Sequence, residues 1–568
     1  MIQERSPSRG AGSPARQSAP DRRETAWTGP SSVVFPGTMM DEPLLLSRIV
    51  DRAGSMFGDQ TIVGYSDDGP VETTYGELVA RVRRLASALV RSGVQVGDRV
   101  ATFAANTLEH LELYLAVPAI GAVLHPLNIR LHADELSYII RHAGDRLVVS
   151  EQSLADRLPL LPQEIQQVHI GPGANRPGVA GYEQLVEAGD EKFQFPRIPE
   201  ESASTLCYTS GTTGVPKGVA YTHRSTVLHT ILESLPDYYA FAETDVVVPF
   251  VPFFHANAWG IPYASLMAGA RLVLPGLRTA PEDIVRILSE QRATYSAGVP
   301  TIWHGVGQLP EIPDLSSLRM VVAGGSALSE QFLTRFDEIG IPVVQGFGMT
   351  EANPLVSIGS VPARSRAHGR DRLRIRQAQG RPLPFVEVRI DDTDHELQIR
   401  GATVTGDFYN PSDDTRDRFT DDGWLRTGDV AELSAGGIIR VVDRTKDVIK
   451  SGGEWIPSVE LEDAITTHPA VAEAVVVGRQ DDRWGERPVA FVVLRPGTTL
   501  DVPGLRDHLA GRVARWWFPD AVEFVDAIPR TSVGKLDKKA MRVVASGVVP
   551  GRSQTDEPPH DSTERNPA

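Results

Sequence analysis

The segment YTSGTTGVPKGV, Tyr208 to Val219, consists mainly of glycines and small hydroxyl residues, together with Lys217. It has almost no apolar side chains to bury, and its backbone is costly to order. An apolar strand, STLCYT, runs directly into it and fixes it at a strand end. Because glycines allow close approach and successive backbone N–H groups form an anion-binding nest, the segment predicts a polyphosphate site. It is not a Walker A loop, since Pro216 precedes Lys217 and Gly218 follows it.

Helix and strand patterns alternate on both sides of this segment. Thr74 and Glu77 have the spacing of a capping box, and Gly93 stands where the following helix should end. A helix, a glycine and a strand succeed one another in HADELSYIIRHAGDRLVV, and strands run into glycines in RATYSAGVP and LRMVVAGG. This pattern predicts an α/β fold with parallel sheets, in which ligands bind at the carboxyl ends of the strands. The predicted helix after Thr74 places on one face the apolar residues Leu78, Val82, Leu85 and Leu89.

The composition excludes several classes of function. The 568-residue chain has a formal net charge of −16, which argues against binding to nucleic acids or to anionic membranes. Its single cysteine, Cys207, lies among apolar residues, so we interpret it as a buried strand residue rather than a nucleophile. A chain without an intrachain disulfide suits a reducing location, and we expect the cytoplasm. No apolar run is long enough to predict a membrane span.

Both ends of the chain have a disordered composition. Residues 1–38 are rich in Ser, Pro, Gly and Arg without apolar periodicity, and residues 546–568 are similar. Met39 and Met40 open the structured part, so we hypothesise that translation starts at one of them. Between the ends we predict a large domain over 39–443 and a small, mobile α+β domain over 444–545. The boundary near Asp443 to Lys446 rests on a short charged segment that follows a strand.

A second motif is VQGFGMTEANP, Val344 to Pro354, in which an apolar strand leads into glycines. Phe347 suits stacking on a base, and Thr350 suits a phosphate contact. Glu351 suits a Mg²⁺ ion beside a triphosphate, because Mg²⁺ prefers one or two carboxylates plus phosphate oxygens. The alternative for Thr350 and Glu351 is the capped start of a helix.

Two further motifs lie toward the C-terminus. GWLRTGDV places Asp429 after a glycine, with Arg444 following in VVDRTKD, and aspartate is the usual acceptor for ribose hydroxyls. PRTSVGKLDKK places Lys535 after a glycine in a predicted loop. We interpret Lys538 and Lys539, which follow it, as solvated charge.

These motifs, with DRTKDVIKSGGEWI, stand in the order that is typical of the adenylate-forming superfamily, which the chain resembles from about Leu44 to Val544. That superfamily includes acyl-CoA synthetases, peptide-synthetase adenylation domains and luciferase-like enzymes. The segments VPFFHANAWGIPY, KSGGEWIPSVELE and WWFPD look most like those of bacterial medium- and long-chain fatty-acid–CoA ligases. The resemblance implies a large N-terminal domain of αβα layered sheets with a β-rich subdomain. It also implies a small α+β C-terminal domain on a hinge.

The resemblance implies an acid–thiol ligase that uses ATP, Mg²⁺ and coenzyme A. A fatty acid is activated as acyl-AMP with release of pyrophosphate, and the CoA thiol then displaces AMP. Lys535 corresponds to the catalytic lysine, with Lys217, Thr350 and Glu351 as the other catalytic residues. Mg²⁺ is implied at Thr209 and Glu351, and the hinge at Lys446. The implied nucleotide-binding residues are Thr209, Ser210, Gly211, Thr212, Thr213, Gly214, Gly218, Gly325, Gln345, Gly346, Phe347, Asp429, Arg444, Lys446, Lys450 and Trp455.

The resemblance also implies residues on the acid and CoA sides. FFHANAWGIPY corresponds to the acyl-tunnel segment, in which Trp259 stands at the position of a gate; ordinary core packing is the alternative for Trp259. We interpret His255 as a pocket-wall residue rather than a base or metal ligand, because no second ligand lies at metal spacing. Gly324 is implied on the acid side. Gly453 lies in the loop Ser451 to Glu454, which is implied to face the pantetheine channel after domain rotation.

One departure from the family pattern and three rival functions remain open. EVRIDDTDHELQIRG is shorter than usual and has His395 where a glycine is usual, which leaves the shape of the β-rich subdomain open. The rivals are a fatty-acyl-AMP ligase that loads a carrier protein, an aryl- or short-chain-acid CoA ligase, and an inactive acyl- or nucleotide-binding protein. We see no insertion of the kind acyl-AMP ligases carry. We expect fatty acid, ATP and CoA as partners, no nucleic acid and no integral membrane contact; a homodimer stays open.

Overall fold

The computed structural model describes residues 38–66, 69–171, 180–209, 215–362, 365–530 and 536–547. Contacts divide the chain into two units, Met1–Glu42 and Pro43–Ala568. In the first unit, Met39 and Met40 are exposed. All elements named below belong to the second unit. The predicted extension and tail lie almost entirely outside the described residues.

The polyphosphate segment joins two neighbouring strands of a largely parallel sheet. This sheet has the order β7-β6-β5-β3-β4-β8-β9, and β9 is antiparallel to β8. Strand β8 (Ala203–Tyr208) carries Thr209 at its carboxyl end, and β9 (Gly218–Thr222) returns with Gly218 opposite Tyr208. The segment therefore opens where the parallel-sheet rule expects a ligand. The other strands are β3 (Arg99–Phe103), β4 (Val123–Pro126), β5 (Asp145–Glu151), β6 (Gln166–Ile170) and β7 (Ala180–Gly181).

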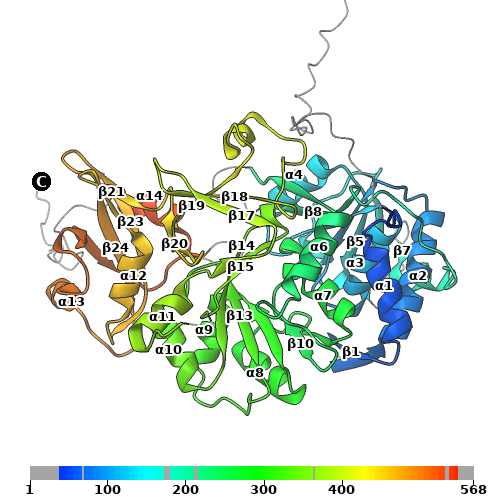
Figure 1. Cartoon of the computed structure of the whole chain (residues 1–568), viewed down its shortest axis with the longest axis horizontal. Helices are drawn as coiled ribbons and strands as arrows, with labels where there is room; N and C mark the ends of the chain where they lie inside the picture. Colours follow the sequence, from blue (N-terminus) through cyan, green and yellow to red (C-terminus); the bar gives the residue numbers. More distant parts are fainter. Residues whose placement is uncertain are drawn as a thin grey trace, which may run out of the picture. The chain divides into compact units, whose positions relative to one another are not determined.

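A second sheet carries the GFGMTE motif. Its order is β16-β15-β14-β13-β12-β10-β11-β1-β2, with parallel pairing from β14 through β1 and antiparallel strands at both edges. Figure 1 shows β13, β14 and β15 side by side. Its strands are β1 (Thr61–Ser66), β2 (Gly69–Thr74), β10 (Val246–Pro249), β11 (Arg271–Leu274), β12 (Tyr295–Gly298), β13 (Met320–Gly324), β14 (Val343–Gly348), β15 (Leu355–Ile358) and β16 (Arg381–Pro382).

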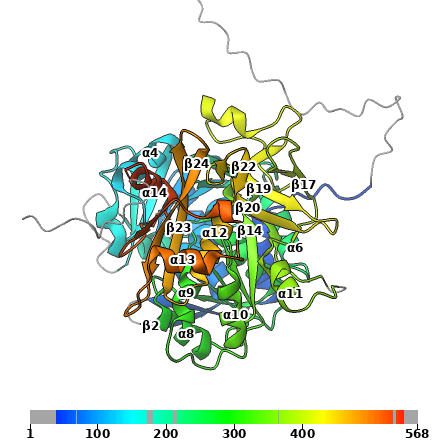
Figure 2. The ribbon, with the colours of Figure 1, turned by 90° about the vertical axis from the view of Figure 1, so that its left-hand side faces the viewer.

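Two smaller sheets follow along the chain. The first, β17-β18-β19-β20, is antiparallel and consists of β17 (Val386–Ile390), β18 (Glu396–Gly401), β19 (Leu425–Leu433) and β20 (Ile439–Arg444). The C-terminal sheet has the order β22-β21-β24-β23, with β25 parallel to β24. Figure 2 shows helices α12 and α13 beside it. Its strands are β21 (Ile449–Ser451), β22 (Glu454–Ile456), β23 (Val471–Asp481), β24 (Gly485–Leu494) and β25 (Ala521–Phe524).

The helix predicted from the capping box is confirmed. In α2 (Tyr75–Arg91), the Thr74 hydroxyl accepts from the Glu77 N–H at 3.2 Å, and the Glu77 carboxylate accepts from the Thr74 N–H at 3.1 Å. The four apolar residues predicted on one face are all buried, and Gly93 follows the helix end with φ +88°. The other helices are α1 (Leu46–Met56), α3 (Leu108–Ala119), α4 (Ala133–Ala143), α5 (Tyr182–Glu187), α6 (His223–Glu233), α7 (Ile261–Ala268), α8 (Pro281–Glu290), α9 (Pro300–Gly307), α10 (Glu330–Glu338), α11 (Gly369–Gln377), α12 (Ser458–Thr466), α13 (Val502–Leu509) and α14 (Lys538–Ala545).

Layered sheets, a β-rich subdomain and a C-terminal α+β part confirm the predicted fold class. Cys207 lies buried on β8, as predicted, and burial raises the pKa of its thiol to about 12, which removes the reactive thiolate. In the part of the chain that the structure describes, no helix combines the length and apolarity that a bilayer crossing requires. The predicted boundary near Asp443 to Lys446 falls between β20 and β21 and stays a prediction.

The interpretation of Lys538 as solvated charge is wrong. Its side chain is 14% exposed, and Nζ lies 2.7 Å from Oε1 of Glu462 on α12. Nζ also donates to the Ser458 hydroxyl at 2.6 Å, and that hydroxyl donates to Asp443. Lys539 is exposed, as predicted. A lysine on the buried face of α14 thus ties this helix to α12, which the sequence around it does not reveal.

Buried neutral histidines make the fold sensitive to acid. His110 is fully buried; its Nδ1–H donates to the Ala105 carbonyl, its Nε2 accepts from the Thr102 hydroxyl, and burial lowers its pKa to about 4. Below about pH 6.5 the His110 ring binds a proton in the unfolded chain but stays neutral in the folded chain. The free energy of unfolding therefore decreases as the pH falls toward 4.

We expect His110→Gln to reduce this loss by about 2 kcal/mol at about pH 5. Thermal unfolding midpoints at about pH 7 and about pH 5 would measure it. His132→Gln is the control, because the His132 side chain is 78% exposed. An equal acid-induced drop in the wild type and in His110→Gln would contradict the assignment.

Candidate active site

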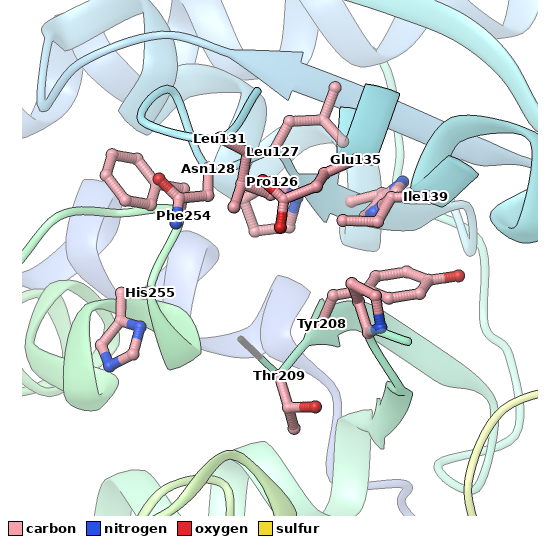
Figure 3. A pocket seen from close by; sticks show the side chains of 12 residues that line it. Pro126, Leu127, Asn128, Leu131, Glu135, Ile139, Tyr208, Thr209, Phe254 and His255 are labelled. Carbon is pink, nitrogen blue, oxygen red and sulfur yellow. The ribbon is translucent and has the colours of Figure 1, made fainter. Parts of the chain in front are cut away.

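One pocket joins the start of the polyphosphate segment to the FFHANAW segment. Thr209 and Pro216 line it from the two sides of that segment, and His255 lines it from the other motif. Figure 3 shows Tyr208 and Thr209 across the pocket from Pro126 and Leu127. His255 therefore lines this pocket, and its role toward the acid stays a prediction. The remaining lining residues are His125, Asn128, Leu131, Glu135, Ile139 and Phe254.

Two hydrogen bonds connect β9, the strand at the end of the polyphosphate segment, to Thr350 of the GFGMTE motif and to Tyr409. The Tyr221 hydroxyl on β9 donates to the Thr350 carbonyl at 2.6 Å, and the Tyr409 N–H donates to the Gly218 carbonyl at 2.8 Å. There is little room for a side chain at Gly218, since an added Cβ would lie 3.2 Å from atoms of Tyr208 and Tyr409. The two ends of the segment are joined, because the Thr209 N–H donates to the Lys217 carbonyl at 2.9 Å and the Lys217 N–H donates to the Thr209 hydroxyl oxygen at 3.3 Å. The GFGMTE motif and the polyphosphate segment thus lie together.

Phe408 and Arg418 lie between Lys217 and Glu351 and connect them. The Lys217 Nζ lies 5.9 Å from the centre of the Phe408 ring, and the Arg418 guanidinium lies 5.8 Å from the same ring. Arg418 also donates to Oε1 of Glu351 at 3.1 Å. Glu351 is 5% exposed, and its neighbour Thr350 lies with it in a short 3₁₀ turn, Thr350–Ala352, rather than at the start of an α-helix. A carboxylate in this position is the kind of side chain that binds Mg²⁺ together with phosphate oxygens.

The glycines on β13 and β14 line up across the sheet. Gly324 pairs with Gly346, and a Cβ on Gly324 would lie 2.8 Å from the Gly346 carbonyl. Gly325 has φ +93°, where only glycine is unstrained. The buried Gln345 fixes the following turn, because its Oε1 accepts from the Leu328 N–H at 3.3 Å. Phe347 is half-buried at the end of β14 and packs against the main core.

Trp259 ends a left-handed turn beside these glycines. The turn η2 (Ala256–Gly260) contains four successive non-glycine residues with φ between +44° and +57°. Such a conformation costs about 1–2 kcal/mol per residue. A Cβ on Gly324 would lie 3.1 Å from the Trp259 ring, so this indole closes the space between the turn and β13. Trp259 is 8% exposed and belongs to the largest hydrophobic core cluster, so the alternative of core packing describes its contacts, and the gate role stays a prediction.

Asp429 and Arg444 face each other on β19 and β20. They are register partners, and Nε of Arg444 lies 2.8 Å from Oδ1 of Asp429. Asp429 is 4% exposed and Arg444 45% exposed at the side chain, so the carboxylate is fixed and the guanidinium reaches solvent. The two residues predicted as a ribose-binding pair therefore lie together.

The other predicted residues lie between β20 and β21 and on the C-terminal sheet. The Lys446 carbonyl accepts from Arg542 at 3.0 Å, and the Lys450 N–H donates to Glu486 at 2.9 Å. Gly453 is exposed with φ +87° between β21 and β22. Trp455 packs edge-on against His395, with ring centres 5.7 Å apart.

The short β17–β18 hairpin is the segment that departs from the family pattern, and His395 stands in its turn. It has φ +52°, the conformation that favours the glycine usual at this position. Its N–H donates to the Asp391 carbonyl at 3.0 Å, which closes the turn. The hairpin is therefore intact, and the non-glycine residue supplies a ring contact to Trp455.

Some predicted residues lie outside the described residues. They are Lys535 of the PRTSVGK motif and the centre of the polyphosphate segment, Ser210, Gly211, Thr212, Thr213 and Gly214. Their assigned roles stay predictions from sequence.

Arg418, Phe408 and Tyr221 were not predicted from the sequence. Arg418 and Phe408 stand in a loop-rich stretch before GWLRTGD, where neither periodicity nor a glycine signals a site. Leu127 and Asn128, which form the pocket wall after β4, were not predicted either. That wall follows the carboxyl end of a parallel strand, so the rule that found Thr209 applies to it as well.

Comparison with known proteins assigns the family. The model of the AMP-binding enzymes matches residues 50–409, and that of the AMP-binding enzyme C-terminal domain matches residues 460–535. A long-chain-fatty-acid–CoA ligase of Thermus thermophilus is 42% identical over 89% of this chain and 97% of its own. A 3-methylmercaptopropionyl-CoA ligase of Ruegeria lacuscaerulensis is 39% identical over 89% and 98%.

A solved structure agrees with these sequence relatives. The crystal structure of ATP-bound MatB from Rhodopseudomonas palustris superposes with a TM-score of 0.76 at 27% identity, over 88% of this chain and 99% of that one. Motifs, fold and relatives point the same way, and the predicted resemblance is confirmed. The chain belongs to the AMP-binding, adenylate-forming enzymes and, within them, to the AMP-forming acid–thiol ligases that make acyl-CoA.

Proposed function

We propose that the chain activates a medium- or long-chain fatty acid as acyl-AMP and transfers the acyl group to CoA. The observation that carries this proposal is the shared pocket, in which Thr209 of the polyphosphate segment and His255 of the acyl segment line one space. The reacting carboxylate and the ATP phosphates need such a common site. The fatty-acid ligase at 42% identity supports the choice of acid. The single buried cysteine fits a reducing cytoplasm.

In the first step, a carboxylate oxygen of the acid attacks the α-phosphorus of ATP. The bond between the α-phosphorus and the bridging oxygen breaks, and pyrophosphate leaves with the electron pair. The polyphosphate segment from Thr209 to Gly218, with the Lys217 ammonium, holds the β- and γ-phosphates, and Thr350 contacts the α-phosphate. Such a reaction depends on positioning and charge neutralisation. Lys535 stabilises the charge that develops between carboxylate and α-phosphate.

The nucleoside is held on the other side of the site. Asp429 accepts from the ribose hydroxyls while Arg444 holds that carboxylate in place, and the backbone of Gly325, Gln345 and Gly346 borders the adenine. Phe347 supplies a ring face for stacking. Lys450 and Trp455 add contacts from the C-terminal part.

The residues present fit a Mg²⁺ ion. Glu351 supplies a buried carboxylate and Thr209 a hydroxyl, and Mg²⁺ in nucleotide sites is completed by phosphate oxygens and water. When bound there, Mg²⁺ neutralises phosphate charge. Arg418 would hold the Glu351 side chain in position through the contact described above.

In the second step, the CoA sulfur attacks the acyl carbon. The bond from that carbon to the phosphate oxygen breaks, AMP leaves with the electron pair, and the thiol proton passes to solvent. Rotation about Lys446 withdraws Lys535 and brings the Ser451–Glu454 loop, with Gly453, toward the pantetheine chain. His255, Trp259 and Gly324 border the acyl group in both steps.

A substrate panel tests this proposal. Enzyme, ATP, Mg²⁺ and CoA are mixed with short, medium, long-chain and aromatic acids, and the acyl-CoA products are measured by mass spectrometry. We expect a maximum among the unbranched medium or long chains. A maximum among aromatic acids or the shortest acids would make the chain an aryl- or short-chain-acid CoA ligase instead.

A further inference from the structure

A buried polar cluster lies directly behind the Trp259 turn, on helix α6. His229 and Glu233 stand one helical turn apart, with exposed side-chain fractions of 1% and 0%, and Nδ1 of His229 lies 3.3 Å from Oε2 of Glu233. Glu233 is pressed against the turn, because a Cβ on Gly260 would overlap its carboxyl group. Asn257, on the same turn, is 1% exposed.

Five of the six polar side-chain atoms of these three residues make no hydrogen bond in the part of the chain that the structure describes. Within the described ranges, neither carboxyl oxygen of Glu233 nor either side-chain atom of Asn257 makes a hydrogen bond. Polar groups buried in this way destabilise a fold, and native structures nearly always satisfy them with protein, water or ligand. The left-handed turn described above covers Glu233. The site therefore combines a strained backbone with polar side chains that lack hydrogen bonds.

The hydrogen bond of His229 and the burial of the pair indicate which kind of partner would suit Glu233. Nε2 of His229 accepts from the Leu355 N–H at 3.0 Å, so the ring proton is on Nδ1 and faces Glu233. Burial lowers the pKa of His229 to about 3 and raises the pKa of Glu233 well above its ordinary value, so the pair is a neutral imidazole and a neutral carboxylic acid. The Glu233 O–H is then a donor without an acceptor. A hydrogen-bond acceptor placed beside Glu233 would satisfy this donor.

We propose that Glu233, supported by His229 and Asn257, determines acid specificity by donating a hydrogen bond to an acceptor atom in the tail of the substrate. The inference rests on the proposed function, which places Trp259, the residue before Gly260, at the acyl chain. The substrate class is a carboxylic acid whose alkyl tail carries an ether, thioether, hydroxyl or carbonyl group. Because the turn covers the Glu233 carboxyl group, the proposal requires the turn to move before the tail of the acid reaches it.

Two acids of equal chain length test this inference, an unbranched alkanoic acid and its analogue with an ether oxygen in place of one distal methylene. For each, kcat/KM of acyl-CoA formation is measured. We expect Glu233→Met, which has the same length without the donor, to lower the ratio of ether acid to alkyl acid about tenfold, the effect of one buried hydrogen bond. Glu233→Gln keeps an N–H donor and should retain most of the wild-type ratio.

The measurements distinguish three cases: a variant that does not fold, a failure of this inference, and a failure of the proposed function. Glu233→Met should unfold at the wild-type temperature or above, since an unsatisfied polar group is removed, and Glu233→Leu is a second apolar variant. An unchanged ratio in the folded apolar variants, with both acids still converted, would overturn this inference alone. If the wild type forms acyl-CoA from neither acid nor from any acid of the panel above, the proposed function fails and this inference with it.

Discussion

Lys535→Ala should lower the rate of acyl-AMP formation about 10²–10³-fold while leaving the CoA step on supplied acyl-AMP largely intact. The lysine acts only while charge develops between the acid and the α-phosphate, and in the second step it is withdrawn with the C-terminal part. Pyrophosphate release measures the first step, and acyl-CoA formation from synthetic acyl-AMP measures the second.

Lys539→Ala is the matched control. Lys539 is an exposed lysine on the helix that follows Lys535, so its loss removes the same charge without touching the substrate. Both half-reactions should stay at the wild-type rate in this variant. Equal losses in the two half-reactions of Lys535→Ala would contradict the assigned role.

Glu351→Gln should reduce acyl-AMP formation about 10²-fold and raise the Mg²⁺ concentration needed for half-maximal rate. The amide keeps the shape and an acceptor for Arg418 but loses the negative charge that a Mg²⁺ ligand needs. A Mg²⁺ titration of the pyrophosphate-release rate would show both effects.

The chain offers a closely matched control for this variant. Glu396 is likewise buried and lies 3.1 Å from an arginine, Arg426, which is the distance between Glu351 and Arg418. Glu396→Gln should therefore cost similar stability but leave the Mg²⁺ dependence unchanged. If both variants shift the Mg²⁺ dependence alike, Glu351 acts through the fold rather than as a ligand.

Local signals predicted much of the fold. The capping box at Thr74 and Glu77, the apolar face of α2 and the glycine after it depend on residues within one helix, so a sequence pattern contains them. The position of Thr209 at the carboxyl end of β8 followed from a strand that runs into glycines. Asp429 and Arg444 were found as a pair through the family resemblance, and their register on β19 and β20 gives the geometric reason.

Long-range packing explains what the sequence did not show. Lys538 lies in a run that looks like surface charge, yet α14 turns it toward Glu462 on α12, about eighty positions away along the chain. Glu233 lies in THRSTVLHTILES, where polar residues alternate with apolar ones as on a surface helix, but α6 is covered on that side by the Trp259 turn. The sequence does not predict that turn either, because alanine and tryptophan disfavour the left-handed conformation.

The most direct test of the central claim is a single reaction followed by mass spectrometry before and after CoA is added. Enzyme, ATP, Mg²⁺ and an alkanoic acid from the preferred length range are mixed first. We predict that acyl-AMP and pyrophosphate appear, and that CoA then consumes the acyl-AMP and yields acyl-CoA and AMP in equal amounts. Acyl-AMP that persists after CoA is added would contradict the account and would indicate an enzyme that loads a carrier protein.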